Sequence, residues 1–359
     1  MELFEFARRN DFEAAMLRRY DGDPFFINNK SGVFGIVSNP KGAFFRSSVQ
    51  RMIGVRLGGD VLCQCVLIRH RNFDKLMVSF FEAAPNASEA VDMMMTYAAE
   101  YGKNAGLSKL IVALDGHCDY SIGFSYGDHA APPLFGESRN PSHYHDYFQN
   151  GYTRYGFSSF WGDFEEICES LESIMSNPKK LAAGISIECA DLKRFRSEMA
   201  RFTDLDNSIF SGHDYHYHRE YDEGLELFRS LKPLMSPHNL IFARKDGKDI
   251  GCMLLYPDFN ELVPIGKKAG IVTVLRHKLL NRRIYTVKIA LVAVAKEHRA
   301  SGAVFALFAK ACRQIRQRHP HTKRIVSSWI SDDNHASRNT TTRFAPNLYE
   351  RYSLYEKTL

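Results

Sequence analysis

Towards its C-terminal end the chain contains the run Ile289-Ala-Leu-Val-Ala-Val-Ala-Lys-Glu-His-Arg-Ala-Ser-Gly302, followed directly by Ala303-Val-Phe-Ala-Leu-Phe-Ala-Lys-Ala-Cys-Arg-Gln-Ile315. The first run begins as a short, β-branched apolar segment, which predicts a buried strand. The second repeats apolar residues at helical spacing, at Phe305, Phe308, Cys312 and Ile315. Residues 296–302 are therefore expected to join a strand to the start of a helix. The free N–H groups and positive dipole end of a first helical turn attract anions, and Gly302 permits close backbone approach, so this junction predicts a phosphate site.

Length and composition bound the class of protein. With 359 residues, 45% of them hydrophobic and 25% charged, the chain has a normal globular balance and enough length for two cores, so we expect two domains. No run approaches the roughly 18 apolar residues of a membrane span, and the N-terminal residues lack the apolar region of a secretory signal. We therefore expect a cytoplasmic protein without a membrane partner. The seven cysteines are odd in number and dispersed, which favours reduced, buried thiols and no metal centre.

Positive charge is concentrated in one part of the chain. Between Lys267 and Arg324 there are fifteen Lys or Arg residues and a single acidic residue, Glu297, so the rest of the chain is net acidic. Such a field attracts polyanionic partners towards the junction at 296–302. Coenzyme A phosphates, an acidic carrier protein and RNA all meet this description, and a solvated helix face is the alternative for the charges at Lys310, Arg313 and 316–318.

The first half of the chain predicts a strand-rich region. Helices are expected at 11–20 and 88–104, and strands at 32–37, 44–45, 51–57, 61–69, 76–81 and 109–114. Gly58 and Gly59 form the expected hairpin turn between two of these strands. Residues 116–150 are rich in Gly, Pro, His and Tyr and are expected to form a long loop, the kind of segment that often borders a site.

The second half repeats this order of elements. Helices are expected at 163–175, 191–200 and 223–235, a turn at Asn177-Pro178, and strands at 181–189, 239–243, 249–256 and 283–295. The strand at 76–81, the helix at 88–104 and the strand at 109–115 correspond in order and length to the elements at 289, 303 and 323–329, which indicates a tandem duplication. The first copy has Glu82 to Ala90, with an acid and a proline, where the second has Lys296 to Gly302. Only the second copy suits a phosphate.

These residues resemble the GNAT acyltransferase superfamily. The resemblance lies in Glu297-His-Arg-Ala-Ser-Gly-Ala-Val304, Asp333-Asn334 and Leu348-Tyr-Glu-Arg-Tyr-Ser-Leu-Tyr-Glu356. More narrowly, Asp23-Pro-Phe-Phe26, Tyr256-Pro-Asp-Phe-Asn260 and Ser328-Trp-Ile330 resemble the tandem, two-GNAT-domain N-acyltransferase-like proteins of bacteria. The resemblance implies an α+β fold of two GNAT-like domains, each a mixed, mostly antiparallel sheet flanked by helices in a three-layer-like arrangement. The expected ranges are 1–162, a degenerate domain on the acceptor side, and 163–359, the acyl-donor side.

The resemblance also implies a donor site. The strand residues Ala293, Val294 and Ala295 would border a splayed strand that accepts pantetheine. Backbone donors to the pyrophosphate would come from Arg299, Ala300, Ser301, Gly302 and Ala303, and Asn334 would lie near the thioester. The chain departs from the family pattern at Val304, where the family usually has Gly or Ala. The larger valine side chain narrows the space through which the pyrophosphate approaches. The chain also has Thr341 where a general-acid tyrosine is common, which leaves Tyr349, Tyr352 or solvent to protonate the thiolate.

Acyl transfer from a thioester needs a deprotonated amine, a donor to the oxyanion and a proton for the leaving thiolate. The candidate bases are His213, His216, His218, Asp258 and Glu261, with Asp333 behind them, and imidazole is favoured because it titrates near neutrality. The candidate acid is Tyr349. The His and Tyr residues of two aromatic segments are candidates for binding the acceptor, namely His143, Tyr144, Tyr217 and His218. The spacing of His213, His216 and His218 fits a partly buried loop or ligand wall better than a zinc site.

Three functions follow from these expectations. The first is an N-acyltransferase that uses acyl-CoA or the phosphopantetheinyl thioester of an acyl-carrier protein docked on the basic 267–324 surface, with a small-molecule amine as acceptor. The second is an aminoacyl-tRNA-dependent transferase, whose binding would fall steeply with salt. The third is a non-catalytic module that binds a carrier protein or small molecule. The absence of base-stacking aromatic residues among the charges of 267–324 argues against the second.

Overall fold

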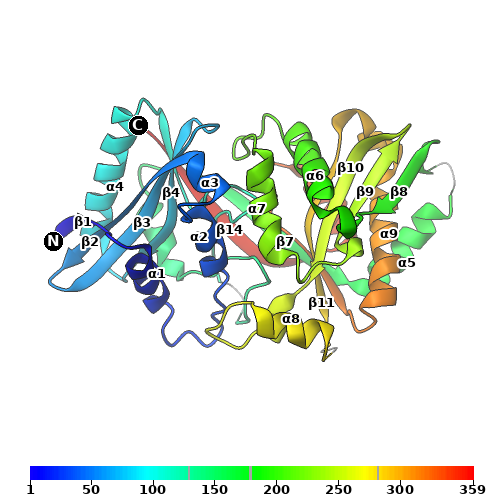
Figure 1. The fold of residues 1–359 in the computed structure, drawn as a ribbon, viewed down its shortest axis with the longest axis horizontal. Helices are drawn as coiled ribbons and strands as arrows, with labels where there is room; N and C mark the ends of the chain where they lie inside the picture. The colour runs from blue at the N-terminus through cyan, green and yellow to red at the C-terminus, as the bar shows by residue number, and fades with distance from the viewer. Residues whose placement is uncertain (128–129, 178–179, 281–282) are drawn as a thin grey trace. The chain divides into compact units, whose positions relative to one another are not determined.

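The computed structural model describes residues 1–127, 130–177, 180–280 and 283–359, which form two compact units (Figure 1). Unit 1 comprises Met1–Phe157, Val263–Ala269 and Glu350–Leu359, and unit 2 comprises Ser158–Leu262 and Gly270–Tyr349. The units therefore do not follow the continuous ranges 1–162 and 163–359, because the last strand of the chain completes the sheet of unit 1. The assignment of acceptor and donor roles to the two ranges stays a prediction.

Unit 1 is built on a sheet with the order β1-β2-β3-β4-β5-β14, in which only the β4–β5 pair is parallel. Its strands are β1 (Glu2–Glu5), β2 (Ser48–Leu57), β3 (Asp60–His70), β4 (Lys75–Ala83), β5 (Lys109–Val112), β6 (Phe124–Ser125) and the C-terminal part of β14 (Asn347–Thr358). Its helices are α1 (Arg9–Arg18), α2 (Lys30–Val37), α3 (Ala43–Arg46), α4 (Ser88–Asn104) and the 3-10 segment η1 (Ser142–Phe148).

Helix α4 covers one face of this sheet because its apolar residues recur with helical periodicity. Its buried residues are Ala90, Val91, Met94, Met95, Ala98 and Gly102. They pack in one core with Cys63, Cys65 and Leu67 of β3. On the other face, Phe34 of α2 stacks on Phe12 of α1 and meets the edge of Phe80 on β4. Phe80 and Phe81 therefore point to opposite faces of β4. Phe80 packs against α2 and Phe81 packs in the core with α4, as expected for a strand buried on both faces.

Unit 2 repeats the arrangement with the sheet order β7-β12-β11-β10-β9-β8, in which only β11 and β12 are parallel. Its strands are the C-terminal part of β7 (Thr153–Asp163), β8 (Ile185–Cys189), β9 (Leu240–Lys245), β10 (Lys248–Pro257), β11 (Thr286–Val294), β12 (Arg324–Ser327) and β13 (Ile330–Ser331). Its α-helices are α5 (Phe164–Met175), α6 (Phe195–Ile209), α7 (Tyr221–Leu231), α8 (Ile271–Lys278), α9 (Ala303–Arg318) and α10 (His335–Phe344). Short 3-10 segments are η3 (Leu192–Arg194), η4 (Pro237–Asn239), η5 (Phe259–Leu262) and η6 (Lys296–Ser301).

Two helix layers enclose the sheet of unit 2. Helices α5 and α9 share one core with β9 to β12, centred on buried residues such as Leu171, Leu307 and Ile289. Helices α6 and α7 cover the other face, where Phe202 and Phe228 meet edge to face at 5.2 Å. The expected α+β architecture, with two mixed and mostly antiparallel sheets flanked by helices, is therefore confirmed.

Most of the predicted elements are present, and the duplication is visible in the sheets. The parallel pair β4–β5 with its crossover helix α4 corresponds to the parallel pair β11–β12 with α9. The expected helix at 88–104 coincides with α4. The strands expected at 32–37 and 44–45 are wrong, because these residues form α2 and α3. Both are short apolar runs, for which hydrophobicity alone does not distinguish a strand from a helix.

Three further expectations concern disulfides, membrane spans and the central turn. All seven cysteines are free thiols, and all but Cys189 are buried. Among the described residues, no helix combines the length and hydrophobicity needed to cross a membrane. The turn expected at Asn177-Pro178 falls partly outside the described residues, which do not include Pro178.

Candidate active site

The central feature of unit 2 is a parallel strand pair that opens. Strand β11 pairs with β12 from Thr286 opposite Arg324 to Ile289 opposite Ser327, and the Ser328 N–H still donates to the Ile289 carbonyl at 2.8 Å. Strand β11 then continues for five residues, Ala290 to Val294, that no longer pair with β12. On its other edge β11 stays paired with β10 up to Val294, across a bulge between Leu254 and Leu255. An extended ligand arm could therefore add to β11 on the side that β12 has left.

The predicted junction follows at the end of β11. Residues Lys296–Ser301 form the 3-10 segment η6, and Gly302, with φ of 79°, is the left-handed N-cap of α9. The Ser301 hydroxyl donates to the His298 carbonyl at 2.6 Å and accepts from the Ala303 N–H at 3.3 Å. Arg299 and Ala300 are exposed on this turn. The sequence therefore identified a strand, turn and helix start correctly, and this is the arrangement in which a helix N-terminus can bind a phosphate.

Backbone from outside the junction packs against it. The Ala182 N–H donates to the Ser301 carbonyl at 2.9 Å, and a Cβ atom on Gly302 would overlap the Lys180 carbonyl oxygen. Gly302 is therefore required both by its positive φ and by the close approach of another chain segment. The half-buried Val304 packs against the apolar core that α5 and α9 share. Its side chain is thus engaged in the protein interior.

One candidate base is influenced by the charge of a junction residue. Partial burial lowers the pKa of His213, and the nearby His216 and Arg299 lower it further, while Asp214 opposes them. His213 and Arg299 are far apart in the sequence, so this electrostatic contact could not be read from spacing. A lowered pKa keeps the imidazole neutral at physiological pH, which is the form that accepts a proton from an amine.

The neighbouring His216 has a different environment. Its side chain is only 4% exposed, and its Nε2 lies 3.2 Å from Oδ2 of the buried Asp206, which also accepts a 2.7 Å bond from Arg219. Asn207 accepts from the Arg219 N–H and donates to its carbonyl. These contacts fix the segment from 206 to 219 and orient His216. Tyr217 is buried as well, whereas His218 is exposed.

The remaining candidates in unit 2 have local roles in the fold. The Asp258 carboxylate accepts from the Asn260 N–H at 3.1 Å at the start of η5, and its own N–H donates to the Thr286 carbonyl. Asn334 is the N-cap of α10 and accepts from the Ser337 N–H at 3.1 Å. Tyr349 is half-buried on β14. The structure does not add a contact that assigns a catalytic role to any of these three, so their roles stay predictions.

Unit 1 has an equivalent opening, but its own side chains fill it. Strand β4 pairs with β5 up to Val78 opposite Val112, and residues beyond it are fully buried. The Tyr144 hydroxyl of η1 accepts from the Ala83 N–H at 3.2 Å and donates to the Glu82 carboxylate at 2.6 Å. The Tyr147 hydroxyl accepts from the Ala87 N–H at 3.1 Å and donates to the Ala84 carbonyl. Segment η1 therefore provides hydrogen bonds to the backbone that corresponds to the phosphate loop of unit 2.

The buried Glu82 anchors this filling. Its carboxylate is fully buried and pairs with Lys30 at 2.5 Å and with the Tyr20 hydroxyl at 3.0 Å. Burial raises the pKa of Glu82, against the opposing effects of Lys30 and the two tyrosines. The predicted acceptor residue Tyr144 is part of this network and is fully buried. The other, His143, is half-buried, and its Nε2 lies 3.2 Å from the Ala83 carbonyl oxygen.

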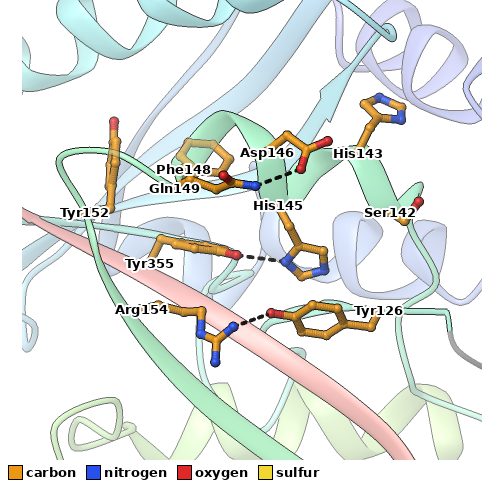
Figure 2. A pocket seen from close by; sticks show the side chains of 10 residues that line it. All are labelled: Tyr126, Ser142, His143, His145, Asp146, Phe148, Gln149, Tyr152, Arg154 and Tyr355. Carbon is orange, nitrogen blue, oxygen red and sulfur yellow. Dashed lines mark hydrogen bonds between the residues drawn. The ribbon is translucent and has the colours of Figure 1, made fainter.

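A cavity of about 560 Å³ lies in unit 1 beside η1 (Figure 2). It is lined by aromatic and polar side chains, namely Tyr126, Ser142, His143, His145, Asp146, Phe148, Gln149, Tyr152, Arg154 and Tyr355. The His145 ring stacks on Tyr126 at 3.9 Å, and its two nitrogens lie 2.8 Å from the Tyr355 hydroxyl and 3.1 Å from the Ser125 carbonyl oxygen. Burial lowers the pKa of His145, so it is a neutral ring with both nitrogens engaged. The volume lies within the range of pockets that bind small molecules, and both aromatic and polar groups line it.

Sequence reasoning found this cavity only in part. Of the lining residues, His143 was predicted to bind the acceptor. Arg154, which donates to the Tyr126 hydroxyl at 2.8 Å, was not predicted. Arg154 is the second residue of β7 and has no local motif around it, so no sequence signal marks it. Tyr355 lies in the closing segment that carried the family resemblance, which is the one signal that could have drawn attention to it.

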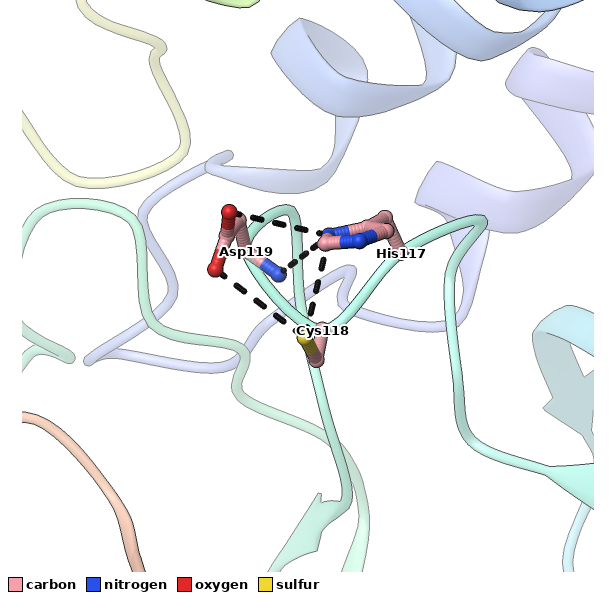
Figure 3. Close-up of side chains that lie close together, drawn as sticks. All are labelled: His117, Cys118 and Asp119. Atoms are coloured by element: carbon pink, nitrogen blue, oxygen red, sulfur yellow. Dashed lines mark hydrogen bonds and ion pairs between the residues drawn. The ribbon is translucent and has the colours of Figure 1, made fainter. Parts of the chain in front are cut away.

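A second group, of potential metal ligands, lies in unit 1 at His117, Cys118 and Asp119, whose ligand atoms are within 4.8 Å of one another (Figure 3). The three are consecutive residues of one turn. The Asp119 N–H donates to His117 Nδ1 at 3.1 Å, and the Cys118 sulfur lies 3.7 Å from the same nitrogen. The lone pair of His117 Nδ1 is thus already used by the backbone. We interpret this group as a hydrogen-bonded turn.

Comparison with known proteins agrees with this geometry. Residues 199–345 match the family model described as the acetyltransferase (GNAT) family. This range contains the opened strand pair, the junction and the His213 segment. No curated protein sequence matches the chain significantly.

Solved structures show the same fold along the whole chain. A tandem GNAT protein from the clavulanic acid biosynthesis pathway, solved without acetyl-CoA, has a TM-score of 0.55 at 12% identity, over 99% of this chain and 98% of its own. A probable N-acyltransferase from Enterococcus faecalis has a TM-score of 0.55 at 10% identity, over 99% and 72%. A GCN5-related N-acetyltransferase from Sphaerobacter thermophilus has a TM-score of 0.52 at 11% identity, over 99% and 95%. The expected tandem GNAT-like fold is confirmed.

Proposed function

We propose that this tandem GNAT-like protein is an N-acyltransferase that moves an acyl group from a pantetheine thioester to the amine of a small molecule. The observation that carries the proposal is the opening of the β11–β12 pair directly before a tight turn and a helix start. An extended pantetheine arm would add to the unpaired edge of Ala290 to Val294, and its phosphate would lie at the start of α9. Unit 2 is the donor side in this proposal.

The chemistry then requires a direct attack. The amine nitrogen attacks the thioester carbonyl carbon, the C–N bond forms and the C–S bond breaks. An N–H group of the unpaired β11 edge would stabilise the oxyanion, as backbone donors do in acyl transfer. We propose His213 as the general base, because its lowered pKa favours the neutral imidazole and the charge of Arg299 on the junction contributes to that lowering. The leaving thiolate takes its proton from Tyr349 or from solvent.

The filled opening of unit 1 supports an acceptor role for that unit. Tyr144 and Tyr147 accept from the backbone N–H groups of Ala83 and Ala87, which a donor would need, and Glu82 accepts from the Tyr144 hydroxyl. We propose that unit 1 contributes to recognition of the acceptor and that the cavity containing His143 and Arg154 takes part in it. An acceptor with a ring and an acidic group would suit the stacked aromatic walls and the guanidinium.

The aminoacyl-tRNA alternative loses support from the placement of the cations. Of the fifteen Lys and Arg residues from 267 to 324, several are buried or bonded to other residues of the protein. Lys288 is 3% exposed, Arg316 pairs with Glu165 and Glu172, and Arg324 donates to Thr286. The surface field is therefore weaker than the sequence implies. An acyl-carrier protein and coenzyme A stay as the two donors to be distinguished.

A thiol-release assay over acyl-CoA and acyl-carrier-protein donors tests the proposal. Arg299→Glu should reduce kcat/KM at least tenfold, because it places a carboxylate beside the donor phosphate. Arg313→Glu, a charge reversal at an exposed position further along α9, is the matched control and should change the rate little. His213→Gln should lower kcat by about 10²-fold or more while the donor KM is kept.

Two outcomes would reject the proposal. The first is the absence of turnover with every thioester donor together with no thermal shift by coenzyme A, which would leave the non-catalytic module as the explanation. The second is retention of charged tRNA on a filter at physiological salt, with retention falling steeply as salt rises, which would make aminoacyl-tRNA the donor.

A further inference from the structure

Helix α8, drawn in yellow in Figure 1, exposes most of its apolar side chains to solvent. Ile271 is 77% exposed, Val272 54% and Leu275 44%, and Leu279 and Leu280, directly after the helix, are 73% and 62% exposed. Single exposed aliphatic residues are common on protein surfaces, but five within ten residues form a continuous apolar patch. Exposure of such a patch to water is unfavourable, and patches of this kind mark surfaces that bind another protein or a membrane.

The inner face of α8 is held by polar groups. Thr273 is 3% exposed, and its hydroxyl accepts from the Gly270 N–H at 3.2 Å. Arg276 donates to the Leu262 carbonyl at 2.6 Å, and the His277 ring meets the Phe259 ring edge to face at 5.1 Å. The helix is thus anchored with Thr and His inward and Ile, Val and Leu outward, the reverse of an ordinary surface helix. The aliphatic face is therefore presented by a fixed element of unit 2.

Cations flank the aliphatic face. At about 100° per residue, Ile271, Leu275, Leu279 and Val272 occupy one arc of the helix, with Lys278 on one side of the arc and Arg276 on the other. From residue 267 to residue 283 the sequence contains six Lys or Arg residues and no acidic residue. Lys278 and Arg283 are exposed, and Lys267 and Lys268 precede the helix in the sequence. A partner that binds this face must therefore be apolar where it contacts the helix and anionic where it meets the flanking cations.

We propose that the outer face of α8 binds the surface of an anionic lipid bilayer. A convex, purely aliphatic ridge with flanking Lys and Arg is what an interfacial segment inserts at the boundary of headgroups and acyl chains. Protein interfaces instead concentrate their energy in Trp, Tyr and Arg anchors that fill pockets, and the outer face of α8 has no aromatic residue. The helix is far too short to span a bilayer, so it lies in the interface. This inference goes beyond the proposed function and revises our expectation of no membrane partner.

The attraction between the Lys and Arg side chains and anionic headgroups makes the binding depend on lipid composition. Each Lys or Arg near an anionic surface contributes about fivefold in binding, and the contribution falls as salt screens the surface potential. Neutral bilayers offer only the apolar contact. Binding of the whole protein should therefore require anionic lipid, weaken with salt and depend on both the aliphatic residues and the cations.

Flotation of the full-length protein with vesicles tests this inference without reference to catalysis. The vesicles are made of phosphatidylcholine alone or of phosphatidylcholine with phosphatidylglycerol. The parent protein should float only with the anionic vesicles. The double variant Ile271→Glu, Leu279→Glu should reduce the partition coefficient at least tenfold, because both side chains are largely exposed and their loss removes apolar contact and adds repulsion. Leu57→Glu, at an aliphatic residue 58% exposed on β2, is the matched control and should float as the parent does.

A second variant guards against misfolding. Lys278→Gln, Arg283→Gln leaves the apolar face intact and should reduce partitioning into anionic vesicles by roughly twentyfold at low salt. The inference is wrong if the parent does not float with anionic vesicles, or if the Glu variant floats as well as Leu57→Glu does. It is also wrong if the parent instead forms a dimer, or binds an acidic carrier protein, that only the Ile271 and Leu279 substitutions abolish, because the face would then be a protein interface.

Discussion

Gly302 illustrates how a single residue can serve a site for a reason other than the one its motif implies. The sequence marks it as a glycine before a helix, where close approach of a phosphate is the usual explanation. The structure adds a left-handed φ of 79° and the carbonyl oxygen of Lys180 in the position of a Cβ atom. The residue therefore holds the segment at 180–182 against the junction, and the stability of the fold is coupled to the shape of the donor site.

Substitution of Gly302 by alanine should destabilise the protein by about 3 kcal/mol or more, because a left-handed alanine costs about 1–2 kcal/mol and the overlap with Lys180 adds to it. Gly212, with φ of 88° and open space around its Cβ position, is the matched control, and Gly212→Ala should cost only about 1 kcal/mol. Chemical denaturation followed by fluorescence measures both. Equal losses at the two positions would show that the Lys180 contact contributes nothing.

The residues of the candidate site were predictable only where they are close in sequence. Arg299, Ser301 and Gly302 follow a strand and precede a helix, so local pattern was sufficient to select them. The electrostatic effect of Arg299 on His213 depends on tertiary structure, which no local pattern encodes. Tyr144 was predicted to bind the acceptor because it lies in a loop rich in His and Tyr, and its burial against Glu82 is likewise a consequence of tertiary packing.

Three elements of unit 2 meet at a group of histidines. His238 of η4 and His319, which follows α9, approach with their Nε2 atoms 3.2 Å apart, and the His277 ring of α8 lies 6.1 Å from that of His319. Burial lowers the pKa of His238 to about 4, with Arg318 and His277 adding to the effect. Burial and the two other histidines lower the pKa of His319 to about 4 as well.

The folded protein should consequently lose stability in mild acid. Both imidazoles bind protons at a lower pH in the folded state than in the unfolded chain, so the unfolded state is favoured as the pH falls from about 6.5 to about 4. Each contributes a loss of up to about 3 kcal/mol over this range. The double variant His238→Gln, His319→Gln should flatten the dependence of unfolding free energy on pH, measured by urea titration from pH 7 to pH 4. An unchanged slope would show that these two groups do not control it.

Elements with a long repeating pattern were predictable, and short ones were not. Helix α4 was located because its apolar residues recur over seventeen positions and end at a glycine. Helix α2 has only eight residues and a run of apolar side chains that also fits a strand, and its contacts with Phe12 and Phe80 decide between the two. The opening of the β11–β12 pair depends on register between strands far apart in the sequence and was available only from the family resemblance.

Unit 1 includes chain segments that follow parts of unit 2 in the sequence. Residues Glu350–Leu359, after the whole of unit 2, supply the strand β14 beside β5 in unit 1. The Glu356 carboxylate there accepts from Lys75 at 2.8 Å and from Lys109 at 2.6 Å, so one residue joins three strands. Unit 1 begins first along the chain, but its sheet is completed only by the last strand in the sequence.

Removal of residues 350–359 should therefore destabilise unit 1 and spare unit 2. Hydrogen exchange read by mass spectrometry should show faster exchange in β4, β5 and β6, which lose their partner strand or its ion pairs, while β10 and β11 keep their protection. Glu356→Gln should produce a smaller change in the same strands. Faster exchange in β10 and β11 at equal extent would contradict the division into two units.

The pairing of β5 with the C-terminal strand β14 has a consequence for synthesis on the ribosome. Strands β1 to β5 leave the exit tunnel first, yet β5 waits for β14 until all of unit 2 has been translated. At about 5–20 residues per second, unit 1 spends tens of seconds with one sheet edge uncovered. The nascent chain is therefore exposed to non-native strand pairing until β14 emerges, and a chaperone that covers that edge should raise the yield of the folded protein.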